Sequence, residues 1–272
     1  MQLKSSYQLD DLIEIMKALR DPETGCPWDL KQTFSSVISH TLEEAYEVAD
    51  AIEREDYDEL KLELGDLLFQ VIFYAQLGKE QEKFDMQDII SGICEKLIRR
   101  HPHVFADEIL STEAEIKANW ETEKAKERES KSNANVRLST LDNIPQSLPA
   151  LSRAIKLQKR CAHVGFDWPN VSQALAKVKE EIAELEHELE QETIDASLVE
   201  AELGDLMFAL TNINRHLKLD AETTMRKANS KFETRFRSLE QLAEAKQYDL
   251  NSLSLEAMEA LWQEVKQNER NG

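Results

Sequence analysis

The fold is decided by residues 171–217, which read VSQALAKVKEEIAELEHELEQETIDASLVEAELGDLMFALTNINRHL. Apolar residues recur in steps of four and three from Val171 to Leu189 and again, after a break near Thr193, from Val199 to Leu217. This spacing is the period of an amphipathic helix. The stretch therefore predicts two helices that lie antiparallel across a short turn and bury their apolar stripes against each other.

Acidic residues flank the two stripes at matched positions. Two of them lie three residues apart on each helix, and so share one helical face: Glu181 and Glu184, and then Glu202 and Asp205. The pair Glu184 and Glu202 is centred on residue 193, and so is the pair Glu181 and Asp205. A hairpin that turns at this point sets each pair level, so the four carboxylates are expected to converge.

The first half of the chain repeats this arrangement. ELGDLLF at 63–69 returns as ELGDLMF at 202–208, and the first-half acids at equivalent places are Glu44, Glu47, Glu63 and Asp66. Trp28 and Trp120 are matched by Trp168 and Trp262 at nearly the same offset. The repeat predicts an all-α protein built as a tandem repeat of two helical-bundle domains, 1–125 and 140–272. Residues 126–139, which are polar, are expected to form a linker.

Composition excludes several classes of protein. The chain has 53 Asp and Glu against 33 Lys and Arg, a net charge of −20, which argues against direct nucleic-acid binding. It contains neither GxGxxG nor GxxxxGK[ST], so a Rossmann fingerprint and a P-loop are excluded. Three cysteines without a CxxC pair, no signal-peptide pattern and no apolar run long enough for a bilayer predict a cytoplasmic protein without membrane contact.

Clustered carboxylates need a counter-charge. Two of them about 4 Å apart repel by about 4 kcal/mol at an effective dielectric constant of about 20. All-oxygen ligands suit Mg²⁺, with Mn²⁺ as an alternative. Two competing interpretations exist: the acids are simply the solvated flank of the helices, or Glu184 and His187 form the ExxH element of a di-iron bundle, although such bundles use that element twice.

A metal site that acts on phosphates needs positively charged side chains nearby to bind those phosphates. Lys231 and Arg235 share one helical face, and their first-half counterparts are Lys96 and Arg100. The helical pattern around Lys231 runs unbroken from 221 to 239, whereas Pro102 stops the pattern around Lys96 at Arg100. A continuous helix holds its ligands more reproducibly, which favours the second half as the catalytic one.

The strings Glu180-Glu181-x-x-Glu184 with Glu202-x-x-Asp205, and Glu43-Glu44-x-x-Glu47 with Glu63-x-x-Asp66, resemble the EExxE…ExxD signature of the MazG family. The resemblance extends over nearly the whole chain and matches the two-domain bacterial arrangement. It implies a homodimeric all-α hydrolase that cleaves nucleoside triphosphates, ATP among them, to the monophosphate and pyrophosphate in nucleotide-pool house-cleaning or regulation. It further implies Mg²⁺ held by Glu181, Glu184, Glu202 and Asp205, phosphates contacted by Lys231 and Arg235, and a pocket completed by Lys177, Glu180, Trp262 and Lys266.

Three glutamates, Glu180, Glu181 and Glu184, are candidates for the general base that accepts the proton of the attacking water. Two other functions compete with the broad pyrophosphohydrolase. One is a nucleotide-sensing helical module that binds without hydrolysis and acts through a regulatory protein partner. The other is a related all-α pyrophosphatase with a narrow nucleotide substrate.

Overall fold

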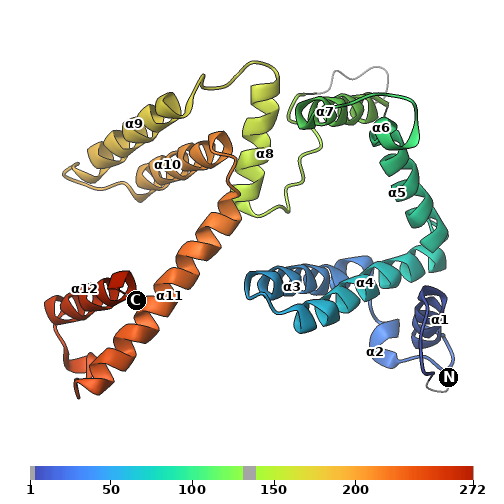
Figure 1. Ribbon diagram of the computed structural model, residues 1–272, viewed down its shortest axis with the longest axis horizontal. Helices are drawn as coiled ribbons and strands as arrows, with labels where there is room; N and C mark the ends of the chain where they lie inside the picture. Colours follow the sequence, from blue (N-terminus) through green and yellow to red (C-terminus); the bar gives the residue numbers. More distant parts are fainter. Residues whose placement is uncertain (1–3, 131–138, 272) are drawn as a thin grey trace. The chain divides into compact units, whose positions relative to one another are not determined.

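The computed structural model describes residues 4–130 and 139–271, which form helices and no strand (Figure 1). The predicted all-α class is therefore confirmed. The chain divides into two compact units, Met1–Asn133 and Ala134–Gly272. None of the helices in the described part is both long and apolar enough to cross a membrane.

The N-terminal unit is organised around the long hairpin of α3 and α4. Its helices are α1 (Leu9–Leu19), α2 (Pro27–Leu30), α3 (Phe34–Glu53), α4 (Tyr57–Glu80), α5 (Met86–Arg100), α6 (Pro102–Phe105) and α7 (Glu113–Ser130). α1 packs on α4, and α7 packs on α5. α5 ends at Arg100 as the sequence predicts, because Pro102 starts the separate short helix α6.

The C-terminal unit repeats this plan. Its helices are α8 (Ala150–His163), α9 (Val171–Leu189), α10 (Ala196–His216), α11 (Ala221–Ala245) and α12 (Leu255–Asn271), with a short 3₁₀ helix at Leu250–Ser252. α9 and α10 form the hairpin, as α3 and α4 do in the first unit. α8 packs on α10 as α1 packs on α4, and α12 packs on α11 as α7 packs on α5. Figure 1 shows α12 against the far half of α11, away from the hairpin. α11 continues unbroken beyond the predicted 221–239.

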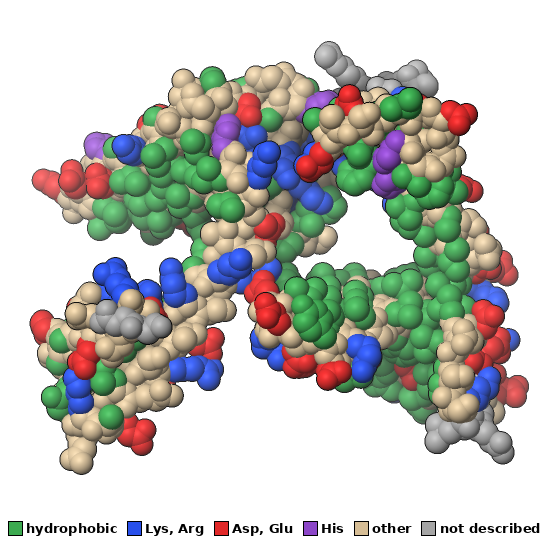
Figure 2. Space-filling model, viewed as in Figure 1, with side chains coloured by type: hydrophobic (Ala, Val, Ile, Leu, Met, Phe, Trp, Pro, Cys, Tyr) green, Lys and Arg blue, Asp and Glu red, His purple; other side chains and the backbone are tan. Residues whose placement is uncertain are grey.

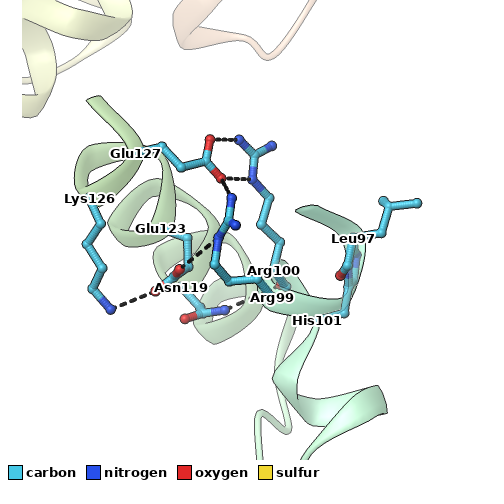
Figure 3. Close-up of polar contacts among 8 residues, drawn as sticks. All are labelled: Leu97, Arg99, Arg100, His101, Asn119, Glu123, Lys126 and Glu127. Carbon is cyan, nitrogen blue, oxygen red and sulfur yellow. Dashed lines mark hydrogen bonds and ion pairs between the residues drawn. The ribbon is translucent and has the colours of Figure 1, made fainter. Parts of the chain in front are cut away.

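The expected linker 126–139 begins inside a helix. α7 runs to Ser130, and its Glu127 carboxylate receives hydrogen bonds from Arg99 and Arg100 of α5 (Figure 3). These ion pairs tie the last described turns of α7 to α5, which the polar composition alone does not reveal. Residues 131–138 of the expected linker lie outside the described residues.

Local signals fix the ends of the α9–α10 hairpin. The Asn170 side chain caps α9 by accepting from the backbone N–H of Gln173, and Asp195 caps α10 by accepting from Ser197. The chain turns between these helices at residues 190–195, where the sequence predicts the break. At the end of α8, Gly165 adopts a positive φ of 88° and closes the helix as a Schellman motif, because Phe166 N–H donates to Cys161 and Gly165 N–H to Ala162.

The apolar cluster of the first unit joins α1 to the α3–α4 hairpin, whereas that of the second unit lies away from the hairpin. One cluster joins Met16, Val37, Ile72, Phe73 and Leu77 in the first unit, and another joins Leu239, Ala243, Leu261 and Val265 where α11 meets α12. The expectation that the α9 and α10 stripes bury each other is wrong in part. Val178 is buried, but Leu175, Ile182, Leu203 and Leu210 stay exposed, because two helices cover only the facing side of each stripe. Figure 2 shows hydrophobic side chains gathered over this hairpin.

Replacement of Leu261 by alanine should lower the free energy of unfolding by about 2–5 kcal/mol, because it leaves a cavity in the α11–α12 core. Leu261 is 4% exposed, whereas Leu255 on the same helix is 75% exposed. Leu255→Ala, the matched control, should change stability by no more than about 0.5 kcal/mol. Urea unfolding followed by circular dichroism measures both, and equal midpoints for the two variants would contradict this assignment of the core.

Candidate functional site

Three carboxylates converge on the flank of the α9–α10 hairpin. Glu181 of α9 and Glu202 and Asp205 of α10 each place one oxygen within 4.8 Å of the others. Glu181 is only 5% exposed, Glu202 is half-buried, and Asp205 is exposed. The antiparallel pairing of the helices brings these acids together across the 190–195 turn. We call Glu181, Glu202 and Asp205 the C-terminal triad.

Lys177 supplies the positive charge beside this triad. Its ammonium Nζ lies 2.7 Å from Glu181 Oε1 and 2.7 Å from Glu180 Oε1, one helical turn further along α9. Hydrogen bonds to Glu180 and then Glu181 raise the pKa of Lys177 above its ordinary value, so the side chain stays charged. Lys177 and Glu180, which the family resemblance assigns to the nucleotide pocket, therefore lie next to the carboxylates.

Glu184 adjoins the triad without joining it. A hydrogen bond with Glu181 and, after it, desolvation raise the pKa of the Glu184 carboxyl. Its oxygens are not among the three that converge within 4.8 Å. The structure thus brings three of the four expected metal ligands together, and the fourth lies in hydrogen-bonding contact with one of them.

The N-terminal unit holds an equivalent cluster. Glu44, Glu47 and Glu63 each place an oxygen within 4.8 Å of the others, and we call them the N-terminal triad. Burial, Asp66 and then Glu47 and Glu63 raise the pKa of Glu44. Burial, Glu47 and Asp66 likewise raise the pKa of Glu63. The two triads share the positions of Glu44/Glu181 and Glu63/Glu202; the third member is Glu47 in the N-terminal unit and Asp205 in the C-terminal unit.

The two clusters differ in their cation. Four residues before Glu44, where the C-terminal unit has Lys177 before Glu181, the chain has His40. The His40 ring packs edge-on against Trp28 at 5.9 Å, and its Nδ1 lies 3.7 Å from Glu43. The signal is present in the sequence, because counting back four residues from Glu44 and from Glu181 gives His40 and Lys177, but no motif points to it.

The remaining predicted substrate-binding residues lie together on α11 and α12. Arg235 of α11 binds Glu269 of α12, and Trp262 of α12 packs against Phe232 with ring centroids 5.3 Å apart. Lys231 lies close enough to lower the pKa of Glu269, after the larger effect of Arg235. Lys266, one turn after Trp262, is half-buried. Within residues 139–271, no hydrogen bond or ion pair joins this group to the C-terminal triad.

The histidine of the di-iron interpretation is not one of the converging side chains. His187 is exposed, and its ring contacts Gln191 in the hairpin turn. It belongs to neither group of converging metal-ligand side chains found among the described residues. The second ExxH that a di-iron bundle requires has no counterpart in α10, so oxygen ligands alone characterise the site.

Comparison with known proteins shows the family of the chain. A model of the MazG nucleotide pyrophosphohydrolase domain matches residues 32–105, which include α3, α4 and α5. A nucleoside triphosphate pyrophosphohydrolase of Escherichia coli (strain K12) is 52% identical over 262 residues, 96% of this chain and 98% of that protein. The chain belongs to the MazG family.

Membership of the MazG family is supported by a second full-length relative. The nucleoside triphosphate pyrophosphohydrolase/pyrophosphatase MazG of Thermotoga maritima is 39% identical over 257 residues, 94% of this chain and 95% of that protein. The resemblance drawn from the EExxE…ExxD strings is confirmed. So is the expectation that the chain is an enzyme of the pyrophosphohydrolase class.

The raised pKa of Glu44 predicts a pH-dependent effect on stability. A carboxyl with a raised pKa binds its proton more tightly in the folded chain, so its contribution to stability is full below the unfolded pKa and is lost as pH rises through the folded pKa. Glu44→Gln, which is neutral throughout, should therefore raise the melting temperature near pH 7 and leave it unchanged near about pH 3.

The measurement is a thermal melt in EDTA, which keeps divalent ions from offsetting the repulsion. Glu95→Gln, at an exposed position of α5 outside the N-terminal triad, is the control and should show no gain at neutral pH. If the melting temperature of Glu44→Gln near neutral pH is equal to or below that of the parent, repulsion among the carboxylates does not destabilise the fold.

Proposed function

We propose that this enzyme hydrolyses nucleoside triphosphates, ribo- and deoxyribonucleotides alike, between the α- and β-phosphates to give the monophosphate and pyrophosphate. The observation that carries the proposal is the C-terminal triad with Lys177 beside it. A carboxylate cluster with one adjoining ammonium offers both a metal site and a phosphate contact. The relatives named nucleoside triphosphate pyrophosphohydrolase support the reaction and its substrates.

The triad fits a magnesium ion by the chemistry of its donors. Three carboxylate oxygens that approach within 4.8 Å of one another, with no nitrogen or sulfur among them, suit Mg²⁺ or Mn²⁺. Glu181, Glu202 and Asp205 would hold the ion, and Glu184 adjoins them. When bound, such an ion neutralises phosphate charge and lowers the pKa of the attacking water.

The chain's own side chains supply the remaining chemistry. Glu180, Glu181 and Glu184 offer carboxylates at the cluster that can accept the proton of the attacking water. Lys231 and Arg235 contact the phosphates, while Trp262 and Lys266 complete the nucleotide pocket. Accurate placement of these groups matters, because phosphoryl transfer depends mainly on positioning and on electrostatic stabilisation.

We assign catalysis to the C-terminal unit. Lys177 adjoins its triad, whereas the N-terminal unit has His40 at that position. In the N-terminal unit, the ring of Trp120, the counterpart of Trp262, is covered edge-on by His101 at 5.3 Å, and its Nε1 is buried without a partner among the described residues. The N-terminal unit then serves in assembly or in weak nucleotide binding.

The working enzyme is a cytoplasmic homodimer in this proposal. Apolar side chains that are 40–53% exposed line the α9–α10 hairpin: Leu175, Ile182, Leu189, Leu198, Leu203, Met207, Phe208 and Leu210. A second copy covers such a face, since contiguous apolar patches of this kind mark interaction sites. The role of the enzyme is the removal or regulation of nucleotides in the cellular pool, directly or with a regulatory protein partner. The free cysteines of the chain suit the reducing conditions of the cytoplasm.

Incubation with a panel of nucleoside triphosphates and Mg²⁺ should release pyrophosphate and the monophosphate, and EDTA should abolish turnover. EDTA should also lower the melting temperature of the metal-loaded protein, because a ligand that binds the folded state stabilises it. Chromatographic identification of products settles the bond that is cleaved. Release of orthophosphate and a nucleoside diphosphate would show that the bond between the α- and β-phosphates is not the one cleaved. Binding without turnover would indicate a nucleotide sensor. Turnover of a single nucleotide would indicate an enzyme with a narrow substrate range.

Glu181→Gln should remove nearly all hydrolysis, with a loss of at least about 100-fold in kcat, because it removes the buried carboxylate at the centre of the triad. Glu44→Gln, the equivalent change in the N-terminal triad, should leave most of the activity. Both variants are assayed with the same nucleotide and checked by circular dichroism. Equal losses would mean two active sites, and a loss only in Glu44→Gln would reverse the assignment.

A further inference from the structure

The same two-pronged ion pair holds an arginine in both units. In the C-terminal unit, Arg235 Nε lies 3.1 and 2.9 Å from the two carboxylate oxygens of Glu269, and Nη2 lies 2.8 Å from Oε2. In the N-terminal unit, Arg100 Nε lies 3.0 Å from Glu127 Oε1, and its Nη2 donates to Oε2 (Figure 3). The arginine lies on α11 and the carboxylate on α12 in the C-terminal unit, and on α5 and α7 in the N-terminal unit.

The position of the carboxylate in the repeat is also the same. Glu127 follows Trp120 by seven residues, and Glu269 follows Trp262 by seven, so each glutamate lies two turns beyond the tryptophan on the same face of its helix. Exposed ion pairs contribute little stability, with a median of about 0–1 kcal/mol. Stability alone therefore does not explain why this pairing occurs at the equivalent place in both units.

The pairing leaves one edge of the guanidinium for another ligand. A guanidinium presents its donors in a rigid fork, which matches an oxyanion along either the Nε–Nη2 edge or the Nη1–Nη2 edge. Glu269 occupies the Nε–Nη2 edge of Arg235. Within residues 139–271, the Nη1 group of Arg235 donates no hydrogen bond, so the second edge can bind a phosphate through two parallel hydrogen bonds.

The second cation of the segment, Lys231, lies near the same carboxylate. The pKa of Glu269 is lowered by the hydrogen bond from Arg235 and then by the nearby charge of Lys231. The hydrogen bonds that the Glu269 carboxylate accepts within residues 139–271 all come from Arg235, so Arg235 is the cation that this carboxylate fixes. The side chains of Arg235 and Glu269 are 24% and 39% exposed, so the pair lies at the surface of the α11–α12 contact and within reach of a ligand.

We propose that Glu269 is a positioning residue for nucleotide hydrolysis: it fixes the Nε–Nη2 edge of Arg235 and thereby presents the other edge to the substrate phosphates. This inference rests on the proposed function, in which Arg235 contacts those phosphates. Glu127 holds Arg100 in the same way in the N-terminal unit. Glu269 itself touches no substrate in this scheme and acts only through Arg235.

The test compares two glutamates of α12, one paired with Arg235 of α11 and the other with Lys246, the residue that caps the C-terminus of α11. Glu269→Gln removes the charge that fixes Arg235, whereas Glu264→Gln breaks the ion pair between Glu264 and Lys246. The side chain of Glu264 is 42% exposed, which is similar to that of Glu269. Glu269→Gln should raise KM for ATP by roughly three- to tenfold with little change in kcat, as expected for loss of a charged hydrogen bond that orients a binding group. Glu264→Gln should leave both constants unchanged.

Two further measurements separate positioning from a structural role. Melting temperatures of Glu269→Gln and Glu264→Gln should fall by similar small amounts, since each variant loses one ion pair. In a double-mutant cycle, Glu269→Gln should have no effect on KM when Arg235 is already alanine, because Glu269 acts through that side chain. Glu269→Asp, which keeps the charge, should recover part of the lost affinity.

Several results would overturn the proposal. The proposal fails if the effects of Glu269→Gln and Arg235→Ala on KM are additive, or if Glu264→Gln raises KM as much as Glu269→Gln does. It also fails if Glu269→Gln lowers KM, because that result would mean that Glu269 competes with the substrate for Arg235. If Arg235→Ala raises KM but Glu269→Gln does not, only the positioning role fails. If the parent protein releases no pyrophosphate, or Arg235→Ala leaves KM unchanged, the proposed function fails first.

Discussion

Repulsion among carboxylates is the constraint around which each hairpin is built. Three acidic groups whose oxygens approach within 4.8 Å repel one another by several kcal/mol at about 4 Å and an effective dielectric constant of about 20. Helix pairing holds them there in spite of this cost. In the C-terminal unit the ammonium of Lys177 offsets part of the charge, whereas in the N-terminal unit burial and the neighbouring acids raise the pKa of Glu44.

The buried apolar clusters contain none of the triad residues. They form around Phe73, where α1 packs on the α3–α4 hairpin, and around Leu261, where α12 packs on α11. The hairpins keep exposed leucines next to their acids. Apolar surface and charged cluster therefore lie on neighbouring faces of the same two helices.

Much of this arrangement could be predicted from the sequence, because it depends on local periodicity. The level pairing of acids about residue 193 and the end of α5 before Pro102 follow from helix geometry and from the chemistry of proline. The sequence did not reveal the hydrogen bonds from Arg235 to Glu269, because the two residues are 34 positions apart on different helices. Nor did it predict which half of each stripe stays exposed, because that depends on where α8 and α1 pack.

In the C-terminal unit, the two groups of residues that we propose to act on the nucleotide lie on different helix pairs. The carboxylates and Lys177 lie on the α9–α10 hairpin, and the cations lie where α12 meets the far half of α11 (Figure 1). Their relative placement therefore depends on the stiffness of α11, which runs for 25 residues without a break. In the N-terminal unit, α5 has 15 residues and ends at the Arg100 that Glu127 holds. A helix that ends at its own cation fixes that group less firmly, because terminal turns lack part of their backbone hydrogen bonding.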